Sequence, residues 1–300
     1  SLNNIKICKT DILAFQPDVI IFIDYPGFNL RIAKWSKVLG FKNHYYISPQ
    51  IWAWKESRIK EIKRDIDKMY VILPFEKTFY EDKHHFPVSF VGHPLIDAIQ
   101  AHPVIDDATF RKENQLNNLP IIALLPGSRK QEITKMLSVM LSVADDFKRY
   151  QFVIAGAPSQ EYSFYQQFIT SENIKFLSNK TYDLLQHATA ALVTSGTATL
   201  ETALFKVPEV VCYKGNWISY QIAKRIITLK YISLVNLIMD KEVVTELIQD
   251  DCNTKRIASE LQKILEPEHR KIVLENYRIL EEKLGGKGAS NHAAEIIVNL

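Results

Sequence analysis

Short runs of aliphatic residues alternate with segments of helical periodicity along almost the whole chain. The run at 18–24 is apolar at its centre and is bounded by Pro17 and Pro26, which predicts a strand buried on both faces of a sheet. Apolar residues recur at helical spacing in 30–39, and Gly40 follows as a stop signal for that helix. Strands separated by helices of about 10 to 15 residues predict a parallel sheet built from right-handed crossovers.

The alternation occurs twice, with a polar and largely irregular stretch at 97–119 between the two series. The first series predicts further helices at 51–67 and 76–82, and strands at 18–24, 44–48, 69–73 and 88–92. The second predicts helices at 129–148, 159–170, 181–187, 196–206 and from 217 onward, and strands at 121–127, 151–156, 174–177, 190–195 and 209–214. We therefore expect an α/β protein of two doubly wound Rossmann-like domains, 1–98 and 99–285, with the cleft between them as the default ligand site.

The first domain begins differently from an ordinary doubly wound domain. A polar stretch and a helix precede its first strand, and the domain is the shorter of the two. This pattern is typical either of a minimal domain or of one that lacks its first βα units.

Composition and charge narrow the function classes. Of the 300 residues 47% are hydrophobic and 24% are charged, as in ordinary globular proteins, and the net charge of +3 is too small to argue for a nucleic-acid partner. The three cysteines lie far apart, with no CxxC pair, which argues against a disulfide framework or a zinc site. No apolar run approaches the ~20 residues of a membrane span, and the first residues show no signal-peptide pattern. We expect a soluble, cytoplasmic protein.

The turn in "IIALLPGSRKQEI" (121–133) joins a buried strand to a helix. Gly127 allows a tight turn, Ser128 begins a helix with outward N–H groups, and Arg129 adds a guanidinium suited to phosphate. A diphosphate site fits this chemistry. The alternative is plain helix capping by Ser128, with Gln131 completing a capping box. The stretch taken alone leaves both interpretations open.

A second strand-to-helix turn, in "TSGTATLE", repeats the theme. Ser195 ends the strand, Gly196 permits close approach, and Thr197 and Thr199 offer hydroxyl and N–H groups at a helix start. Glu201 follows one helical turn later, where a carboxylate can accept both hydroxyls of a ribose. An ordinary helix start with an exposed Glu is the alternative. Two such turns at the same edge of one sheet favour a nucleotide-diphosphate site.

Three polar residues follow strands of the first domain. Asp24 comes at the end of the first strand, and Asn29 lies near the start of the next helix. Asp24 is suited to act as a general base or to bind an acceptor, or else simply forms the turn. His93 follows the last strand, where a histidine can donate to an anionic sugar group, take a proton, or serve a structural role.

The stretch "SPQIWAWKESRIKEIKRDIDK" (48–68) combines an apolar stripe with many basic residues. Trp52 and Trp54 lie at one end of it, after Ser48. A basic amphipathic helix of this kind either lies on an anionic bilayer or packs its stripe on a sheet. The aromatic and basic segment 216–238 has the same two interpretations.

Six stretches, in one order and covering most of 18–252, resemble the lipid-A-disaccharide synthase family: "HYYISPQIWAWKESRIKEI", "LPFEKTFYED", "FVGHPLIDAI", "IALLPGSRKQEI", "SGTATLETAL" and "IAKRIITLKYISLVNLIMDKEVVTELIQDDC". The resemblance implies an inverting GT-B glycosyltransferase that transfers 2,3-diacylglucosamine from its UDP conjugate to 2,3-diacylglucosamine 1-phosphate (lipid X). The products are lipid A disaccharide 1-phosphate and UDP. It also implies that neither a metal nor a cofactor takes part, so helix N-termini and arginine stabilise the leaving diphosphate.

The resemblance also assigns roles to residues. The UDP-binding set is Gly127, Ser128, Arg129, Ser195, Gly196, Thr197, Thr199, Glu201 at the ribose and Asn236 beside the donor. Asp24 and His93 are the catalytic candidates, and the acceptor and membrane side comprises Asn29, Ser48, Trp52 and Trp54. The helix in 286–300 is expected to return to the first domain. The lipid substrates imply a cytoplasmic protein held peripherally on the inner membrane, and a homodimer stays open as its oligomeric state.

The chain departs from the family pattern in three places. The family's "GExSGD" motif is absent, Gly27 stands where many relatives have a second Asp, and Val235 replaces a proline beside Asn236. Because of the first departure, a truncated, non-catalytic UDP-binding module stays open as an alternative function. Another UDP-GlcNAc-type GT-B transferase or a 2-epimerase would share the two nucleotide turns but not "SPQIWAW" or "LPFEKTFY".

Overall fold

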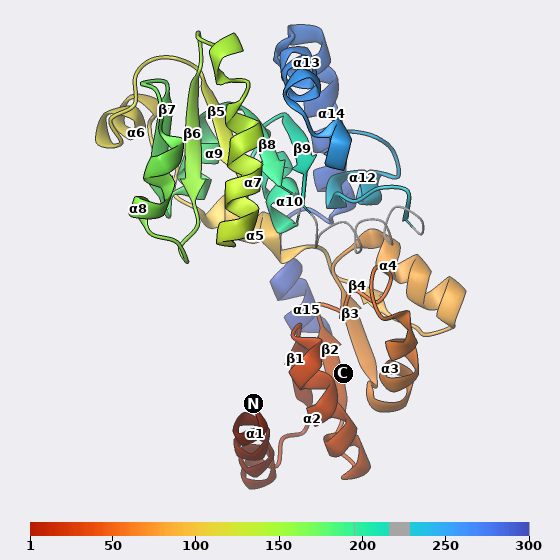
Figure 1. The fold of residues 1–300 in the computed structure, drawn as a ribbon. Helices are drawn as coiled ribbons and strands as arrows, with labels where there is room; N and C mark the ends of the chain where they lie inside the picture. The colour runs from red at the N-terminus through yellow and green to blue at the C-terminus, as the bar shows by residue number, and fades with distance from the viewer. Residues whose placement is uncertain (195, 216–228, 300) are drawn as a thin grey trace. The chain divides into compact units, whose positions relative to one another are not determined.

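The computed structural model describes residues 1–194, 196–215 and 229–299. The chain divides into two compact units, which are drawn in Figure 1. Unit 1 comprises Ser1–Asp97 and Lys283–Leu300, and unit 2 comprises Ala98–Glu282. Each unit is built on its own parallel sheet, as the alternating pattern predicts.

Unit 1 has a four-stranded sheet in the order β1-β2-β3-β4. Its strands are β1 (Ile20–Ile23), β2 (Asn43–Tyr46), β3 (Lys68–Val71) and β4 (Ser89–Phe90). Its helices are α1 (Leu2–Phe15), α2 (Pro26–Val38), α3 (Ile59–Asp65), α4 (Pro74–Thr78) and α15 (Ala289–Val298), with a π-helix at Phe79–Lys83 and α5 (Pro94–Ala101) at the boundary with unit 2. Every neighbouring pair of strands is parallel, so the carboxyl ends of all four strands share one edge.

The long helix expected at 51–67 is a wrong prediction. Only a 3₁₀ turn (Glu56–Arg58) and α3 are helical there, and the chain turns at 51–54. Lys55 takes a φ of 55°, in the left-handed region, which ends any right-handed helix at that point. The Trp52 ring instead packs edge-on against Phe75, with ring centroids 4.8 Å apart.

The expectation of a first strand buried on both faces is also wrong. Phe22 of β1 is buried against α2, but Ile21 and Ile23 on the other face are 43% and 57% exposed. The strand lies at the end of the sheet order, so its outer edge has no partner strand among the described residues. An apolar run therefore marks a half-covered edge strand here, because the two cases share one sequence pattern.

Unit 2 has a six-stranded parallel sheet in the order β10-β9-β8-β5-β6-β7. The strands are β5 (Ile121–Leu125), β6 (Gln151–Gly156), β7 (Ile174–Ser178), β8 (Ala188–Thr194), β9 (Glu209–Tyr213) and β10 (Thr245–Ile248). The helices are α6 (Asp107–Glu113), α7 (Lys130–Leu141), α8 (Tyr162–Tyr165), α9 (Thr181–His187), α10 (Thr197–Leu204), α12 (Leu234–Met239), α13 (Thr254–Leu265) and α14 (Pro267–Lys283), with 3₁₀ turns at Ala144–Asp146, Gln166–Phe168 and Gln249–Asp251. Strand β10 pairs with β9 in a region that the sequence predicted to be mainly helical.

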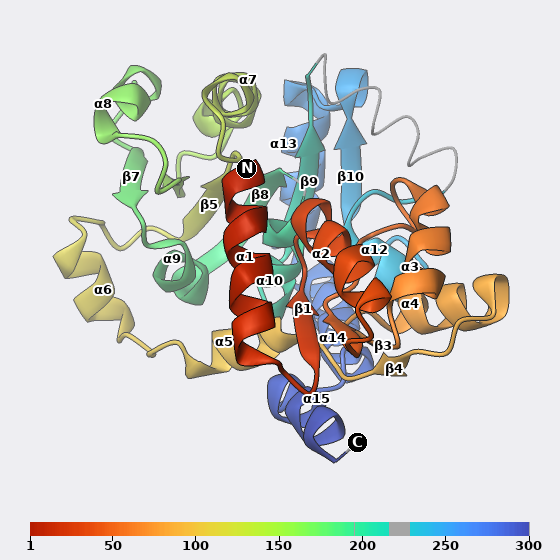
Figure 2. The same cartoon turned by 90° about the horizontal axis from the view of Figure 1, so that it is seen from below.

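The sheet of unit 2 is covered on both faces, as the figures show (Figure 2). Alternate residues of β5 enter two separate clusters: Ile122 and Leu124 pack with α7 and α13, while Ala123 and Leu125 pack with α9. This explains the unbroken apolar runs of the central strands. No helix in the described part of the chain is long and apolar enough to cross a membrane.

Candidate active site

The two predicted strand-to-helix turns of unit 2 lie side by side. β5 and β8 are neighbours, with Leu125 opposite Val193, so the turns that follow them share the carboxyl edge of the sheet. A hollow of about 560 Å³ opens there. Its lining is Leu125, Pro126, Gly127, Ser128, Arg129, Glu132, Ala155, Gly156, Ala157, Pro158, Thr181, Thr194, Thr197, Ala198 and Glu201. Ligands of open α/β sheets bind at this edge.

The first turn favours glycine at Gly127, because its φ is +97°, which side-chain-bearing residues rarely adopt. A Cβ there would also lie 1.7 Å from the Oε1 atom of Glu132, so the Glu132 side chain would have to move. The Ser128 N–H donates to the same Oε1 atom over 3.0 Å. Helix α7 begins at Lys130 with Arg129 as its N-cap, and no side chain caps it. The predicted capping by Ser128 and Gln131 is therefore wrong, and Glu132 serves that end of the helix instead.

The Glu132 carboxylate accepts from the Ser128 N–H, a donor that could also bind an anionic ligand. The Ser128 carbonyl is held from the other side, because Gln160 Nε2 donates to it over 3.0 Å. The turn is thus fixed at both its N–H and its C=O, with Arg129 beside it on the wall of the hollow. A fixed backbone turn, a helix N-terminus and a guanidinium together form an anion site.

Replacing Glu132 by Gln is expected to tighten the binding of UDP about fivefold. The amide oxygen can still accept from Ser128 N–H, so the turn keeps its shape, while one negative charge leaves the hollow. Two unit charges roughly 8 Å apart near a surface interact by about 2 kcal/mol. Screening by physiological salt reduces this to about 1 kcal/mol, which is about fivefold in affinity. Calorimetric titration with UDP measures this change, with uridine as the uncharged control. Weaker binding of UDP would show that the carboxylate itself is needed to hold the turn.

The second turn begins at Gly196, which has a φ of 117° and is the N-cap of α10 without a side-chain cap. Thr197 lines the hollow at the helix start. The buried Thr199 hydroxyl donates to the Gly196 carbonyl over 3.0 Å, so it shapes the turn, and Thr199 does not line the hollow. Thr194 also lines the hollow, and its buried Oγ1 atom has no partner among the described residues. Ser195 lies outside the described residues.

Glu201 lies one turn into α10, on the wall of the same hollow. Burial raises the pKa of its carboxyl, and a hydrogen bond with the Tyr182 hydroxyl opposes that rise. The side chain is therefore half-buried, held by one neighbour, and still open to the hollow. A carboxyl in this setting can accept hydroxyl groups of a ligand.

Asn236 has no donor or acceptor of its side-chain amide left for a ligand. Its Oδ1 atom accepts from the N–H groups of Val243 and Val244, and its Nδ2 atom donates to the Val244 carbonyl and to Glu246. The residue is fully buried at the start of α12. It organises the 243–246 segment, a role that the "VNL" motif alone does not reveal.

Asp24 lies in an unusual turn at the carboxyl end of β1. Asp24 and Tyr25 both have a φ of 48°, a left-handed conformation that non-glycine residues avoid. The Asp24 carbonyl accepts from the Tyr45 hydroxyl and from Asn29 Nδ2, each over 2.6 Å. Asn29 thus supports the turn itself, and it leaves the Asp24 side chain exposed.

His93 is placed after β4 with its ring nearly buried. Its Nδ1 atom accepts from the Leu95 N–H over 3.1 Å, so in the neutral ring the Nε2 atom carries the proton. Burial lowers the pKa of the ring to about 4. The imidazole is therefore neutral near pH 7 and is suited to donate from Nε2 rather than to take a proton.

The tryptophan segment after β2 is anchored in unit 1. Ser48 is buried and its Oγ atom lies 2.6 Å from the Tyr80 hydroxyl. Trp52 is partly buried against Phe75, and Trp54 is exposed. Sequence reasoning did not single out Tyr80 or the buried Glu76 beside this segment, although both lie in the "LPFEKTFY" stretch.

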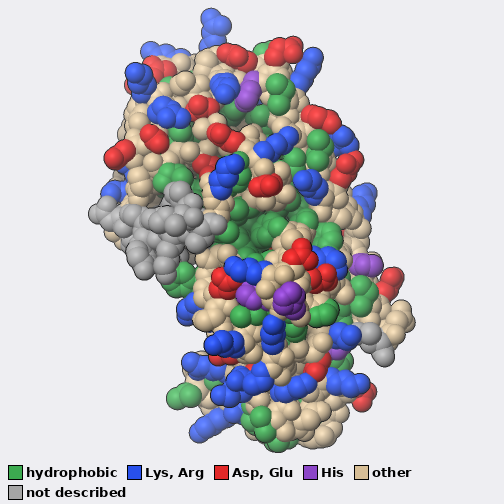
Figure 3. Space-filling view, turned by 90° about the vertical axis from the view of Figure 1, so that its right-hand side faces the viewer, with side chains coloured by type: hydrophobic (Ala, Val, Ile, Leu, Met, Phe, Trp, Pro, Cys, Tyr) green, Lys and Arg blue, Asp and Glu red, His purple; other side chains and the backbone are tan. Residues whose placement is uncertain are grey.

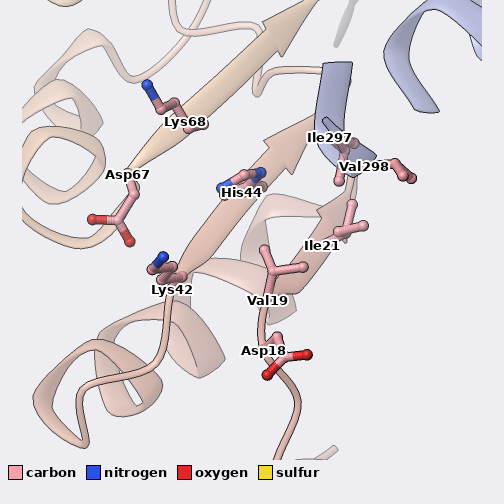
Figure 4. Close-up of a pocket in the computed structure, with 9 residues that line it drawn as sticks. All are labelled: Asp18, Val19, Ile21, Lys42, His44, Asp67, Lys68, Ile297 and Val298. Carbon is pink, nitrogen blue, oxygen red and sulfur yellow. The ribbon is translucent and has the colours of Figure 1, made fainter. Parts of the chain in front are cut away.

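A second hollow, of about 720 Å³, lies in unit 1 away from these residues (Figure 4). It opens along the exposed face of β1 to β3, where Ile21, His44 and Lys68 lie opposite one another across the strands, and α15 contributes Ile297 and Val298. Its remaining residues, Asp18, Val19, Lys42 and Asp67, precede their strands. This hollow therefore lies toward the amino ends of the strands, the edge that α/β proteins do not use for ligands.

The chain matches one protein family over almost its whole length. The family model described as Lipid-A-disaccharide synthetase matches residues 2–298. The lipid-A-disaccharide synthase of Syntrophus aciditrophicus is 41% identical over 300 residues, which cover 97% of this chain and 78% of that protein. That of a Coxiella burnetii strain is 39% identical over 290 residues, covering 95% and 76%.

Solved structures share the fold at low sequence identity. The Neisseria meningitidis UDP-GlcNAc 2-epimerase bound to UDP-GlcNAc matches with a TM-score of 0.70 at 13% identity, over 100% of this chain and 81% of that one. The calicheamicin glycosyltransferase CalG4 matches with a TM-score of 0.60 at 14% identity, over 98% and 76%. At such identities these structures show the two-domain GT-B fold and nothing finer.

Proposed function

The chain belongs to the lipid-A-disaccharide synthase family, a family of glycosyltransferases of lipid A biosynthesis, and from that premise we propose how its two units share the reaction. Unit 2 binds the donor, UDP-2,3-diacylglucosamine, and unit 1 binds the acceptor, lipid X. The observation that carries this proposal is the hollow at the carboxyl ends of β5 and β8, where two glycine turns and Arg129 meet.

The donor diphosphate lies, in this proposal, against the turns at Gly127 and Gly196. In an inverting transfer the bond between the sugar C1 atom and the diphosphate breaks, and UDP leaves with the electron pair. The N–H groups at the starts of α7 and α10, together with Arg129, stabilise the charge that develops on the diphosphate. Glu201 accepts the ribose hydroxyls. Every lining residue of the hollow comes from unit 2, so the proposal holds for a monomer and for a homodimer alike.

Asp24 acts on the acceptor in the same step. The 6-hydroxyl oxygen of lipid X bonds to C1 as the diphosphate leaves, and its proton passes to the Asp24 carboxylate. The strained, exposed turn at Asp24 and Tyr25 supports this role, because left-handed non-glycine residues cluster at functional sites. His93, neutral and protonated at Nε2, donates a hydrogen bond to an anionic group of a substrate.

Unit 1 also meets the cytoplasmic face of the inner membrane in this proposal. Unit 1 has sixteen Lys and Arg against twelve Asp and Glu, whereas unit 2 has twenty-one against twenty-two. Blue Lys and Arg side chains gather over unit 1 in the lower part of Figure 3. Unit 1 also exposes large apolar side chains, among them Phe15, Tyr25, Val38, Leu39 and Trp54. A basic surface with exposed apolar groups favours an anionic bilayer.

Reversing two charges on α3, with Lys60→Glu and Lys63→Glu together, is expected to weaken membrane affinity about 30-fold or more. Each Lys near an anionic surface contributes about 1 kcal/mol. Flotation with vesicles containing phosphatidylglycerol measures the bound fraction, and phosphatidylcholine vesicles give the uncharged reference. Lys255→Glu with Lys263→Glu on α13 of unit 2 changes the net charge equally. An equal loss in both double variants would show that net charge alone, rather than unit 1, is responsible.

One assay tests the function as a whole. The protein is incubated with UDP-2,3-diacylglucosamine and lipid X in detergent, and disaccharide 1-phosphate and UDP are measured. We expect the two products in equal amounts. Binding of UDP without turnover would favour a donor-binding module that lacks catalysis, and the absence of UDP binding would refute the assignment of unit 2.

A further inference from the structure

Strand β2 leads into a segment, 47–54, that is fixed to unit 1 with little regular structure of its own. Ser48 and Ile51 are buried, and Ile47 has a φ of 62°. The segment leaves the carboxyl edge of the sheet next to the Asp24 turn, since Ile23 lies opposite Tyr46 in the strand register. An irregular segment in this place needs side-chain contacts to keep one conformation.

Glu76 lies at the centre of those contacts. Its side chain is 1% exposed. Its Oε1 atom accepts from the Leu73 N–H over 3.1 Å, at the N-cap of α4. The Trp52 and Ser48 side chains also lie close enough to its carboxyl group to favour the charged form, while the Ser48 hydroxyl donates to the Pro49 carbonyl over 2.7 Å. One buried acid therefore joins the first turn of α4 to two residues of the segment after β2.

The contact with Trp52 is the looser one. The buried Trp52 Nε1 atom has no described partner at strict hydrogen-bond geometry, yet it lies close enough to the Glu76 carboxyl to favour its charged form. The Trp52 ring is held independently by Phe75, the residue before Glu76. Ser48 is held independently by the Tyr80 hydroxyl, one helical turn after Glu76. Helix α4 and the π-helix thus hold the segment at both ends.

No cation among the described residues compensates Glu76. The groups that act on its carboxyl are the backbone N–H groups of Ile72 and Leu73 and the side chains of Ser48 and Trp52, and the uncharged Tyr80 lies beside it. Burial outweighs these donors and raises the pKa of the carboxyl to about 8. Near pH 7 the group is therefore mostly neutral, and a glutamine can imitate it closely.

We propose that Glu76 is a positioning residue for the acceptor: it holds segment 47–54 in the conformation that binds lipid X at the Asp24 edge of unit 1. This inference rests on the proposed function, because that function places the acceptor on unit 1. Glu76 itself touches no reacting atom. It acts through Ser48 and Trp52.

The test compares Glu76→Ala with Glu76→Gln by equilibrium binding of lipid X in detergent micelles, with UDP binding measured in parallel. We expect Glu76→Ala to weaken lipid X binding about 10-fold or more and to leave UDP binding within twofold. Glu76→Gln keeps the acceptor and donor atoms and is expected to restore lipid X binding at pH 7. Where turnover is measured, the KM for lipid X rises with little change in the KM for the donor.

The pH dependence separates the conservative variant from the native residue. The pKa of Glu76 is about 8 in the fold against an ordinary value of 4.5, so the folded state holds its proton more tightly than the unfolded state. Stability conferred by that proton is therefore present at low pH, and it declines as the pH rises from about 4.5 to 8. Relative to Glu76→Gln, the native protein is expected to lose Tm between about pH 5 and 8, and to lose lipid X affinity as the folded carboxyl ionises around pH 8.

Glu209 supplies the matched control. It is equally buried, in β9 of unit 2, and is paired with the Tyr277 hydroxyl at 3.3 Å. Glu209→Ala is expected to lower the Tm as Glu76→Ala does and to leave lipid X binding unchanged. An equal loss of lipid X binding in both alanine variants, or no rescue by Glu76→Gln, would overturn the inference. Absence of turnover with lipid X binding intact would count against the proposed function alone.

Discussion

Replacing Arg129 by Ala is expected to lower kcat/KM about 100-fold to 1,000-fold and to weaken UDP binding far more than uridine binding. Arg129 lies on the wall of the hollow next to Gly127 and Ser128, at the start of α7. A charged donor aimed at a leaving group strengthens its interaction as negative charge develops, and removing one such donor costs roughly 10²–10³ in rate. Arg129→Lys keeps the charge but loses the planar fork, so we expect it to recover only part of the loss.

Lys130→Ala is the control for this change. Lys130 is the next residue and carries the same charge as Arg129. Its ammonium group lies 5.6 Å from the centre of the Phe164 ring. Titration calorimetry with UDP and with uridine separates the phosphate contribution from the base and ribose. Equal losses for the two ligands in Arg129→Ala would refute a phosphate role for the guanidinium.

Asp24→Asn is expected to lower kcat about 100-fold to 10,000-fold while UDP binding stays unchanged. A positioned general base contributes roughly 10²–10⁴, and the amide cannot take the proton of the acceptor hydroxyl. Asparagine tolerates the left-handed conformation of this position, where φ is 48°, so the turn is kept. The Tyr45 and Asn29 contacts are made to the Asp24 backbone carbonyl and survive the substitution.

Single-turnover kinetics with saturating donor measures the effect on the chemical step. Asp18→Asn changes an exposed carboxylate just before the other end of β1 and is expected to leave the rate unchanged. A rate within about threefold of the native protein in Asp24→Asn would exclude this carboxylate as the base.

The parts of the fold that the sequence predicts well are those with a strong local signal. β5, Gly127 and α7 succeed one another with a buried run, a positive-φ glycine and a helical period, so the turn and its neighbours are readable from one stretch. The same signals place the second turn at Gly196, and parallel pairing brings the two turns together.

The failures have tertiary causes. The basic stretch from Ile51 has helical periodicity, but Trp52 packs on Phe75 and Lys55 reverses the chain, so the helix starts later. Strand β10 is four residues long and half polar, and only its pairing with β9 makes it a strand. Local propensity gives way in both cases to contacts that a single stretch does not encode.

The candidate site divides in the same way. Residue types and spacing identify the turns and Glu201, which line the hollow. Residue types and spacing do not distinguish residues that contact a bound molecule from residues that stabilise the site. The polar side-chain groups of Thr199 and Asn236 form hydrogen bonds within the protein. Glu132 accepts from the Ser128 N–H and Glu76 from the Leu73 N–H. The sequence does not reveal such contacts, because a glutamate in a helix gives the same sequence pattern with or without them.

The left-handed pair at the end of β1 also sets a limit on engineering. Each such non-glycine conformation costs on the order of 1–2 kcal/mol. The backbone conformations of Asp24 and Tyr25 therefore lower the free energy of unfolding by an appreciable part of its value for a typical domain. Glycine at Tyr25 would relieve part of that cost and would also free a backbone now locked by the Tyr45 and Asn29 contacts to Asp24. Selection of thermostable variants should therefore enrich substitutions in this turn, and the same variants should turn over more slowly.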